Sequence, residues 1–125
     1  MNNNNDYFGE TQEMVRLNVE KFVDKEVRPF IEEWEERGEF PRTIYEKAGA
    51  AGILGIGHPE KYGGTDVDIF SKIAASEALM RSTSGGFVAS LGSLDIGLPL
   101  IWKWGASSLK DRVVAVAVSK AIEFG

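Results

Sequence analysis

The sequence predicts an all-α protein of about five helices in an antiparallel, bundle-like and orthogonal arrangement. Over long stretches, apolar residues recur at three- and four-residue steps, which is the spacing of one face of a helix. Proline and glycine stand at the borders of these stretches, where helices begin and end. No internal repeat or long linker divides the 125 residues. We therefore expect one domain over residues 11–125, preceded by a flexible tail at residues 1–10.

The first helix is expected to be long and bent. Pro29 lies inside its apolar pattern, and a proline removes the backbone hydrogen bond to the carbonyl four residues earlier, here that of Lys25. The apolar pattern nevertheless continues beyond the proline, so one kinked or interrupted helix is predicted. The residues expected to face the core are Val15, Val19, Phe22, Val23, Val27, Phe30, Ile31 and Trp34.

A second helix is predicted from about Pro41 to Ala51. Proline fits the first turn of a helix because its missing N–H would have no partner there. Gly52 follows the helix and suits the left-handed residue that commonly ends one. The residues expected to face inward are Ile44, Tyr45 and Ala48.

A third helix is predicted to begin near Asp66 or Asp68, because either carboxylate can accept hydrogen bonds from the free N–H groups of a first turn. Glu77 and Arg81 are four residues apart and are expected to pair on its surface. The apolar side of this helix is expected to consist of Ile69, Phe70, Ile73, Ala74 and Met80.

A fourth helix is predicted from Ser82–Ser84 to about Trp104, interrupted by glycines and by Pro99. Its apolar residues lie on every side, and a helix of that kind has neighbours on every side. The fourth helix is therefore predicted to be central. Its apolar residues are Phe87, Val88, Leu91, Leu94, Ile96, Leu98, Leu100, Ile101 and Trp102.

A last helix is predicted to open at Ser108, where the residues up to Asp111 form a pattern like a capping box. The β-branched run from Val113 to Val118 would suit a strand equally well. We expect a helix here and treat residues 113–125 as atypical.

Composition excludes several classes of function. The net charge of −5 and the pI near 4.9 argue against nucleic acid and anionic membranes as partners. The absence of cysteine excludes disulfides, thiolate zinc sites and thiol nucleophiles, and it fits a reducing cytoplasm, where we expect the protein. No apolar run is expected to reach the roughly 20 residues of a membrane span.

No catalytic or metal-binding residue is assigned from the sequence. His58 is the single histidine, and no carboxylates lie near it at metal-ligand spacing, so a structural role is predicted. The glycines at positions 52, 55, 57, 63 and 64 lack both the dinucleotide and the P-loop pattern and are interpreted as turns. The acidic run is interpreted as a solvated helix face, and it comprises Glu32, Glu33, Glu35, Glu36 and Glu39.

Several segments, in order and with matching gaps, resemble the N-terminal helical domain of the acyl-CoA dehydrogenase family. They are EKFVDKEVRPFIEEWEERGEFP at 20–41, AGAAGILGI at 48–56, PEKYGG at 59–64, SEALMRSTSGG at 76–86 and SLGSLDIGLPLIWKWGASSLKDR at 90–112. The turn Tyr62-Gly63-Gly64 recurs at this place in the family. The resemblance covers roughly Gln12 to Arg112.

The resemblance implies a flavoenzyme with a helical N-terminal domain, a middle β-domain and a C-terminal helical domain. Such enzymes oxidise an acyl-CoA thioester at Cα–Cβ with a glutamate base and FAD, and pass electrons to electron-transfer flavoprotein. Their fourth helix lines the acyl-chain pocket, which would place Phe87, Leu91 and Asp95 at that pocket. The family's catalytic glutamate and most of its flavin site lie outside the matched region. The chain alone is therefore expected to be inactive and not to hold FAD tightly, and its cofactor-binding residues stay unassigned.

Two other functions are compatible with the sequence. One is a stand-alone helical module for protein interaction or self-association, derived from that domain. The other is a small-ligand binder that keeps the acyl groove. A homo-oligomer is expected in either setting, because the fourth helix carries more apolar surface than one small domain covers.

Overall fold

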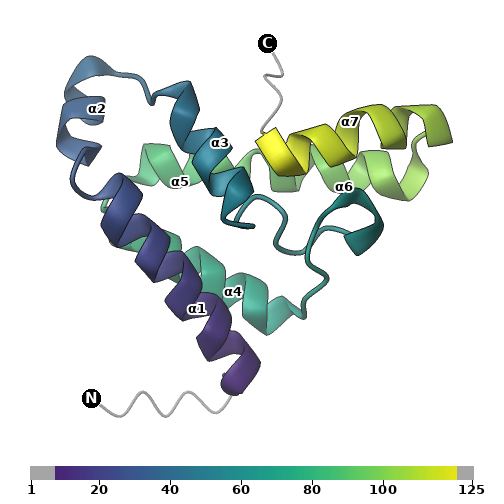
Figure 1. Ribbon diagram of the computed structural model, residues 1–125, viewed down its shortest axis with the longest axis horizontal. Coiled ribbons are helices and arrows are strands. Elements are labelled where there is room, and N and C mark those ends of the chain that lie inside the picture. Colours follow the sequence, from purple (N-terminus) through teal and green to yellow (C-terminus); the bar gives the residue numbers. More distant parts are fainter. Residues whose placement is uncertain (1–7, 121–125) are drawn as a thin grey trace.

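The computed structural model describes residues 8–120 as helices joined by turns (Figure 1). These residues contain no strand, only one isolated bridge between Ile56 and Thr65, and the all-α class is confirmed. The first and fourth predicted helices are each divided in two, so the described residues form seven α-helices instead of about five. They are α1 (Glu10–Phe22), α2 (Ile31–Arg37), α3 (Arg42–Ala50), α4 (Ile69–Leu79), α5 (Gly85–Gly92), α6 (Leu94–Trp104) and α7 (Ser107–Lys120).

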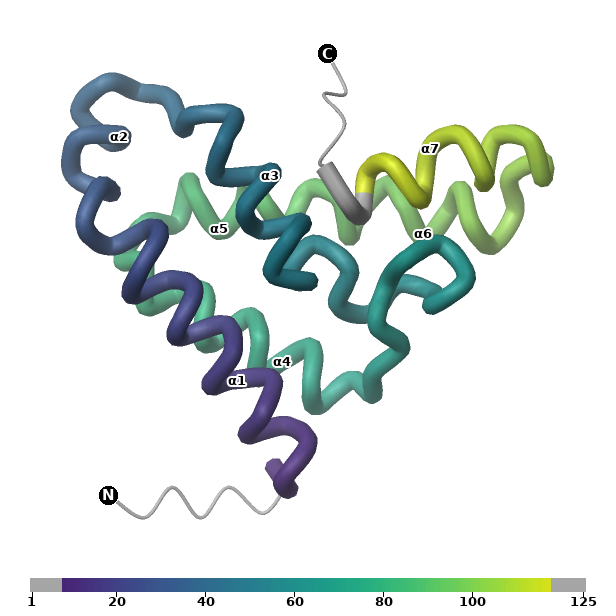
Figure 2. Tube along the Cα trace, in the orientation of Figure 1, coloured from purple at the N-terminus to yellow at the C-terminus, as the bar shows by residue number. Residues whose placement is uncertain are grey.

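The helices form two packed groups with α3 between them (Figure 2). In the first group, α1 lies against α4 along most of its length. In the second group, α5 continues into α6, and α7 runs back along α6 (Figure 1). Helix α3 contacts α7, which joins the N-terminal half of the chain to the C-terminal half.

The first predicted helix is interrupted at Pro29, as expected. Helix α1 continues into a π-helical turn, Val23–Val27, in which the N–H of Arg28 donates to the carbonyl of Val23 at 2.9 Å. The chain then breaks over residues 28–30 before α2 begins, because proline cannot continue the hydrogen-bond ladder. The prediction for Phe30 is wrong: it lies in the break and its side chain is 44% exposed.

The end of α3 confirms the predicted role of Gly52. This residue adopts φ +79°, and the N–H of Ile53 donates to the carbonyl of Ala48 at 2.9 Å, which is the closing bond of a Schellman motif. Pro41 stands one residue earlier than expected, as the N-cap of α3. Both ends of α3 are therefore set by residues whose backbone preferences are known from the sequence, Pro41 and Gly52.

The turn from residue 59 to residue 64 is compact because its glycines fit where other residues would not. Tyr62 is buried at the end of a short 3-10 turn, Glu60–Tyr62, and Gly63 follows with φ +88°. A Cβ on Gly64 would lie 2.4 Å from the carbonyl oxygen of His58. The two glycines therefore hold Tyr62 and His58 in place.

Of the two predicted N-cap positions, Asp66 and Asp68, the structure uses Asp68 to cap α4. Its carboxylate accepts hydrogen bonds from the backbone N–H and the hydroxyl of Ser71 and from the side chain of Gln12. The Ser71 hydroxyl is the main reason that the pKa of Asp68 is lowered. The predicted pairing of Arg81 with Glu77 is wrong: a 3-10 turn, Met80–Ser82, follows α4, and Arg81 donates to Asp24 instead.

The buried side of α4 differs from the predicted one. Small residues face α1, because they let the two helices approach closely, and they are Ser71, Ala74, Ala75 and Ala78. The larger apolar residues of α4 point away from α1, so only Ala74 of the predicted side is buried. The exposed residues, here called the α4 patch, are Ile69, Phe70, Ile73 and Met80.

The described residues cover α5 and α6 on one side only, which differs from the prediction that the fourth helix is surrounded. Ser84 caps α5 through its hydroxyl, and the two helices meet at Ser93. The buried side consists of Phe87, Leu91, Leu94 and Leu98. The opposite side of α6, here called the α6 stripe, consists of Ile96, Leu100 and Trp104, which are 78%, 60% and 76% exposed.

The C-terminal segment is helical as far as the structure describes it. Helix α7 begins at Ser107, so Ser108 lies within the first turn and is not the N-cap that was predicted. The β-branched run from Val113 belongs to this helix, with Val114 and Ala117 buried. Residues 121–125 lie outside the described residues.

An aromatic cluster joins α2, and the residues just before and after it, to α5. The ring of Phe87 in α5 lies 5.5 Å from that of Phe40 and 6.3 Å from that of Trp34 in α2. Phe30 stacks on the outer face of Trp34 at 5.7 Å. Phe87 is fully buried and Trp34 is 7% exposed, so this cluster is a main part of the core.

Truncating Phe87 is expected to cost far more stability than truncating Phe30. Phe87→Ala leaves a closed cavity and should lower the free energy of unfolding by about 3–5 kcal/mol. Phe30→Ala removes a half-exposed ring of the same size and should lower it by about 1 kcal/mol. Urea unfolding followed by the helical circular dichroism signal measures both. Equal losses, or a native spectrum dominated by strand, would contradict this description of the core.

Candidate functional site

A chain of polar side chains runs through the domain at His58. This histidine is 1% exposed, and its Nε2 lies 3.0 Å from Oδ1 of Asp95 in α6. The indole N–H of Trp102, also in α6, donates to its Nδ1 at 3.3 Å. Both ring nitrogens therefore have partners, and both partners come from the same helix.

The hydrogen-bond partners favour one tautomer of this histidine. An indole N–H can only donate, so Nδ1 of His58 accepts and carries no proton. A neutral imidazole then carries its proton on Nε2 and donates it to the carboxylate of Asp95. The network fixes the direction of each hydrogen bond from Trp102 through His58 to Asp95.

The network ties the turn after α3 to α6. Asp95 and Trp102 are seven residues apart, which is two turns of a helix, so both reach the same side chain. The predicted structural role of His58 agrees with this arrangement. Among the described residues, no group of three or more histidine, cysteine, aspartate or glutamate side chains could hold a metal ion.

The residues predicted for the acyl-chain pocket lie in two environments. Phe87 and Leu91, 0% and 5% exposed, face the core of this domain. Asp95, the next residue at this spacing, reaches the surface with a side chain that is 48% exposed. Contact of these three residues with an acyl chain stays a prediction.

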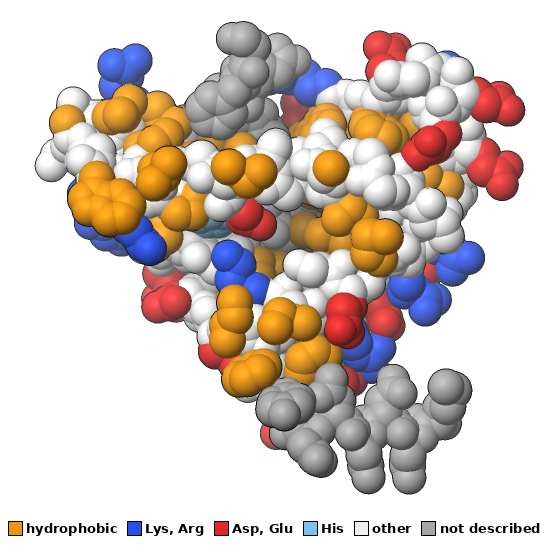
Figure 3. Space-filling model, turned by 180° about the vertical axis from the view of Figure 1, so that it is seen from behind, with side chains coloured by type: hydrophobic (Ala, Val, Ile, Leu, Met, Phe, Trp, Pro, Cys, Tyr) orange, Lys and Arg blue, Asp and Glu red, His pale blue; other side chains and the backbone are white. Residues whose placement is uncertain are grey.

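Two apolar surfaces are exposed: excess apolar surface was expected on the fourth helix, but the one on α4 was not predicted. The rear face of the molecule shows hydrophobic side chains over α4 and over α6, with charged side chains between them (Figure 3). These are the α4 patch and the α6 stripe. A signal for the first was present, since small residues at helical spacing from position 71 to position 78 favour the close contact with α1.

Helices α5 and α6 together correct the expectation that no run is long enough to span a membrane. Gly85–Trp104 is 20 residues long and apolar enough to do so by length and composition alone. The core helix of a soluble protein can meet the same criteria of length and composition. Leu94 and Leu98 of this run pack inside the domain. Asp95 lies in the middle of the run and is bonded to His58.

The acidic run is solvent-exposed, as predicted. Glu32, Glu33, Glu36 and Glu39 are exposed on or just after α2. Glu35 is exposed as well, and it accepts a hydrogen bond from the hydroxyl of Ser84 at the start of α5. Its role is therefore to link α2 to α5.

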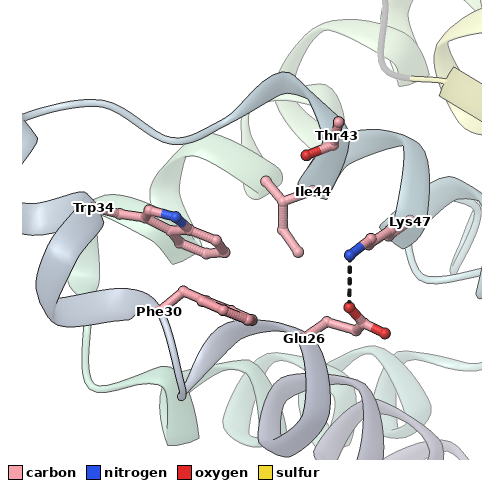
Figure 4. A pocket seen from close by; sticks show the side chains of 6 residues that line it. All are labelled: Glu26, Phe30, Trp34, Thr43, Ile44 and Lys47. Atoms are coloured by element: carbon pink, nitrogen blue, oxygen red, sulfur yellow. Dashed lines mark hydrogen bonds and ion pairs between the residues drawn. The ribbon is translucent and has the colours of Figure 1, made fainter.

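A small open pocket lies between α2 and α3, with a volume of about 190 Å³ (Figure 4). An ion pair of 2.9 Å between Lys47 and Glu26 closes one end. This volume is below the roughly 300–1,000 Å³ of typical ligand sites, so the pocket does not fit a flavin. Its lining residues are Glu26, Phe30, Trp34, Thr43, Ile44 and Lys47.

Comparison with known proteins identifies relatives of the whole described fold. The family model of the acyl-CoA dehydrogenase N-terminal domain matches residues 9–121. The mitochondrial long-chain specific acyl-CoA dehydrogenase of Rattus norvegicus is 41% identical over 107 residues, which are 86% of this chain and 25% of that protein. The chain thus spans about a quarter of the length of the curated relatives it matches.

Solved structures agree with the sequence comparison. A probable acyl-CoA dehydrogenase from Mycobacterium abscessus superposes with a TM-score of 0.85 at 30% identity, over 93% of this chain and 31% of that one. A glutaryl-CoA dehydrogenase from Mycobacterium smegmatis, solved in complex with FADH2, has a TM-score of 0.81 at 23% identity, over 94% of this chain and 30% of that one, and shares the fold.

Substitutions at Asp95 test the buried network. Asp95→Leu removes the acceptor of the His58 proton and should lower the free energy of unfolding by about 1–3 kcal/mol, the cost of a buried unpaired donor. Asp95→Asn keeps an acceptor oxygen in the same place and should cost less than about 1 kcal/mol. Thermal and urea unfolding compare the two variants. If Asn destabilises as much as Leu, the hydrogen bond from His58 does not hold α6.

Proposed function

The chain belongs to the acyl-CoA dehydrogenase family and matches the N-terminal domain of that family. We propose that it forms the N-terminal domain of an FAD-dependent acyl-CoA dehydrogenase. The reaction of such an enzyme removes hydrogen from Cα and Cβ of an acyl-CoA thioester. The proposal is supported by the match over nearly the whole chain and by the 41% identity to the long-chain enzyme of the rat.

The structural observation that carries this proposal is the exposed apolar side of α6, the α6 stripe. Exposed apolar areas larger than a few hundred Å² usually mark a surface that another structure covers. The α6 stripe and the α4 patch lie on the same face of the molecule (Figure 3). In a full-length enzyme, the remaining three quarters of the protein would cover this face.

Within that enzyme, the proposed part of this domain in substrate binding is one wall of the acyl-chain pocket. Phe87, Leu91 and Asp95 are the candidate residues, as the family resemblance implies. Asp95 is the one of the three that reaches the surface. The hydrogen bond from Nε2 of His58 orients the carboxylate of Asp95. A ligand that reached this wall would meet Asp95 first.

The flavin site of such an enzyme would lie mostly outside this chain, as the family resemblance implies. The pocket between α2 and α3 is smaller than a typical ligand site, and a larger hollow of about 380 Å³ is lined by Glu32, Glu35 and Glu36, whose charges would repel the pyrophosphate of FAD. Gly52, Gly57 and Gly63, which follow α3, serve as turns with positive φ. No buried side-chain nitrogen or oxygen among the described residues lacks a partner and so awaits a cofactor. We therefore propose that the isolated chain neither holds FAD tightly nor turns over acyl-CoA. Acyl-CoA and electron-transfer flavoprotein would be partners of the full-length enzyme.

A second candidate function is a stand-alone helical module for protein interaction. The α6 stripe favours it, because a module of this kind also needs an apolar contact surface. The encoding gene separates the two. A reading frame roughly three times as long would support the first, in keeping with a chain that covers 31% of a related structure. A stop codon directly after Gly125 would support the second.

The isolated chain is expected not to bind FAD and not to react with acyl-CoA. The measurement is a titration of the purified chain with FAD, followed by flavin fluorescence, and then anaerobic addition of an acyl-CoA with detection of flavin bleaching. An intact acyl-CoA dehydrogenase is the positive control. Stoichiometric quenching of flavin fluorescence, or any substrate-dependent bleaching, would contradict the proposal that the active site lies mostly outside this chain.

A further inference from the structure

Asp95 is the single charged residue between Gly85 and Trp102, in a run of otherwise apolar and small residues. One oxygen of its carboxylate, Oδ1, accepts the Nε2 proton of His58, and the side chain is 48% exposed. No hydrogen bond or ion pair joins the other oxygen to a described residue. In the tautomer that the network favours, His58 is neutral, so nothing in the network balances the charge of the carboxylate.

A second free acceptor lies on the same turn of α6. Pro99 is inside this helix and has no N–H, so the backbone carbonyl of Asp95, four residues earlier, lacks the donor that a helix normally supplies. Gly92, about one turn before Asp95, has open space where a Cβ would be. Position 95 therefore offers two kinds of oxygen acceptor and a negative charge, with room for a ligand beside them.

Such a site distinguishes ligand groups by the hydrogen bonds that they can make. An ammonium or a hydroxyl group donates to the free oxygens, whereas a carboxylate can only accept and carries the same charge as Asp95. A methyl group would displace water from the carboxylate without replacing its hydrogen bonds, which is unfavourable. The bond from His58 already orients the carboxylate, so less freedom is lost when a donor binds.

We propose that Asp95 selects acyl-CoA substrates whose acyl chain carries a hydrogen-bond donor, an ammonium or a hydroxyl group, where it reaches α6. His58 is 1% exposed and acts through the carboxylate, so it is a positioning residue. The inference rests on the proposed function, in which α6 belongs to one wall of the acyl-chain pocket. It adds a substrate class to that function, acyl chains that are polar at this level and not anionic there.

Substrate profiling of the full-length enzyme with its flavin bound tests the proposal. Acyl-CoA thioesters of equal length that end in a methyl, hydroxyl, ammonium or carboxylate group are compared by kcat/KM over a series of chain lengths. At the length that reaches α6, hydroxyl and ammonium ends should exceed methyl ends by about 10-fold and carboxylate ends by about 100-fold. The difference should appear mainly in KM, because a contact with the acyl chain binds substrate and transition state alike.

Asp95→Asn separates the charge from the position of this residue. The amide keeps an oxygen for His58 and replaces the free carboxylate oxygen with an NH2 donor. The carboxylate-ended substrate should therefore gain about 10-fold or more relative to the ammonium-ended one. Glu77→Gln, which removes an exposed carboxylate from α4, is the matched control and should leave all ratios unchanged. Circular dichroism confirms that each variant is folded.

Substitutions of His58 test its positioning role. His58→Leu removes the donor that orients Asp95 and should weaken the preference for the hydroxyl end. The side chain in His58→Gln can accept from Trp102 and donate to Asp95, so this variant should restore most of the preference. A preference that both variants lose equally would contradict positioning by hydrogen bonds.

The ring nitrogens of His58 provide a readout that needs neither flavin nor acyl-CoA. The chain has one histidine, so the imidazole 15N signals belong to this residue alone. At mildly alkaline pH, Nε2 should carry the proton and Nδ1 should carry none. A proton on Nδ1 would overturn the orientation of Asp95 by His58.

Two results would overturn the selection of substrates by Asp95. One is a preference of the unmodified enzyme for carboxylate or methyl ends at every chain length. The other is a set of ratios that Asp95→Asn leaves unchanged while it lowers the thermal stability of the enzyme, which would assign Asp95 to a contact between domains. In both cases the enzyme still oxidises acyl-CoA and the proposed function stands. Absence of activity toward every acyl-CoA would overturn both proposals, so the two failures are distinguishable.

Discussion

Helices α5 and α6 carry apolar residues on two sides, and the described chain has enough residues to cover one of them. Phe87, Leu91 and Leu98 fill that side and hold the aromatic cluster, α3 and α7 together. The other side stays in contact with solvent at Ile96, Leu100 and Trp104. This one-sided burial explains why a chain with a well-packed core still carries a surface typical of an interface.

Much of the fold could be predicted because its boundaries depend on local chemistry. Pro29, Gly52 and Asp68 each act on the backbone within four residues, and the interrupted helix, the Schellman motif and the N-cap follow from them. The choice of buried face could not be predicted in the same way. In α4, the close contact with α1 buries the small residues, whereas the spacing of the apolar residues had predicted a side made mostly of larger ones.

The candidate site was only partly predictable for a related reason. The spacing of Phe87, Leu91 and Asp95 is visible in the sequence, but it is also the spacing of a buried helix side, and two of the three residues are in the core. The partnership of His58 with Asp95 and Trp102 joins residues 37 and 44 positions apart. No local pattern encodes a contact of that range, so the orientation of α6 had to come from the structure.

The most direct test of one-sided burial is the solvent accessibility of the three indole groups in the dilute, monomeric chain. Tryptophan indole NMR signals recorded with a soluble paramagnetic agent report it. Trp34 is 7% exposed, Trp102 is bonded to His58, and Trp104 is 76% exposed. We expect the agent to broaden the signal of Trp104 strongly and to leave the other two sharp. Equal protection of all three signals in the monomer would contradict the account.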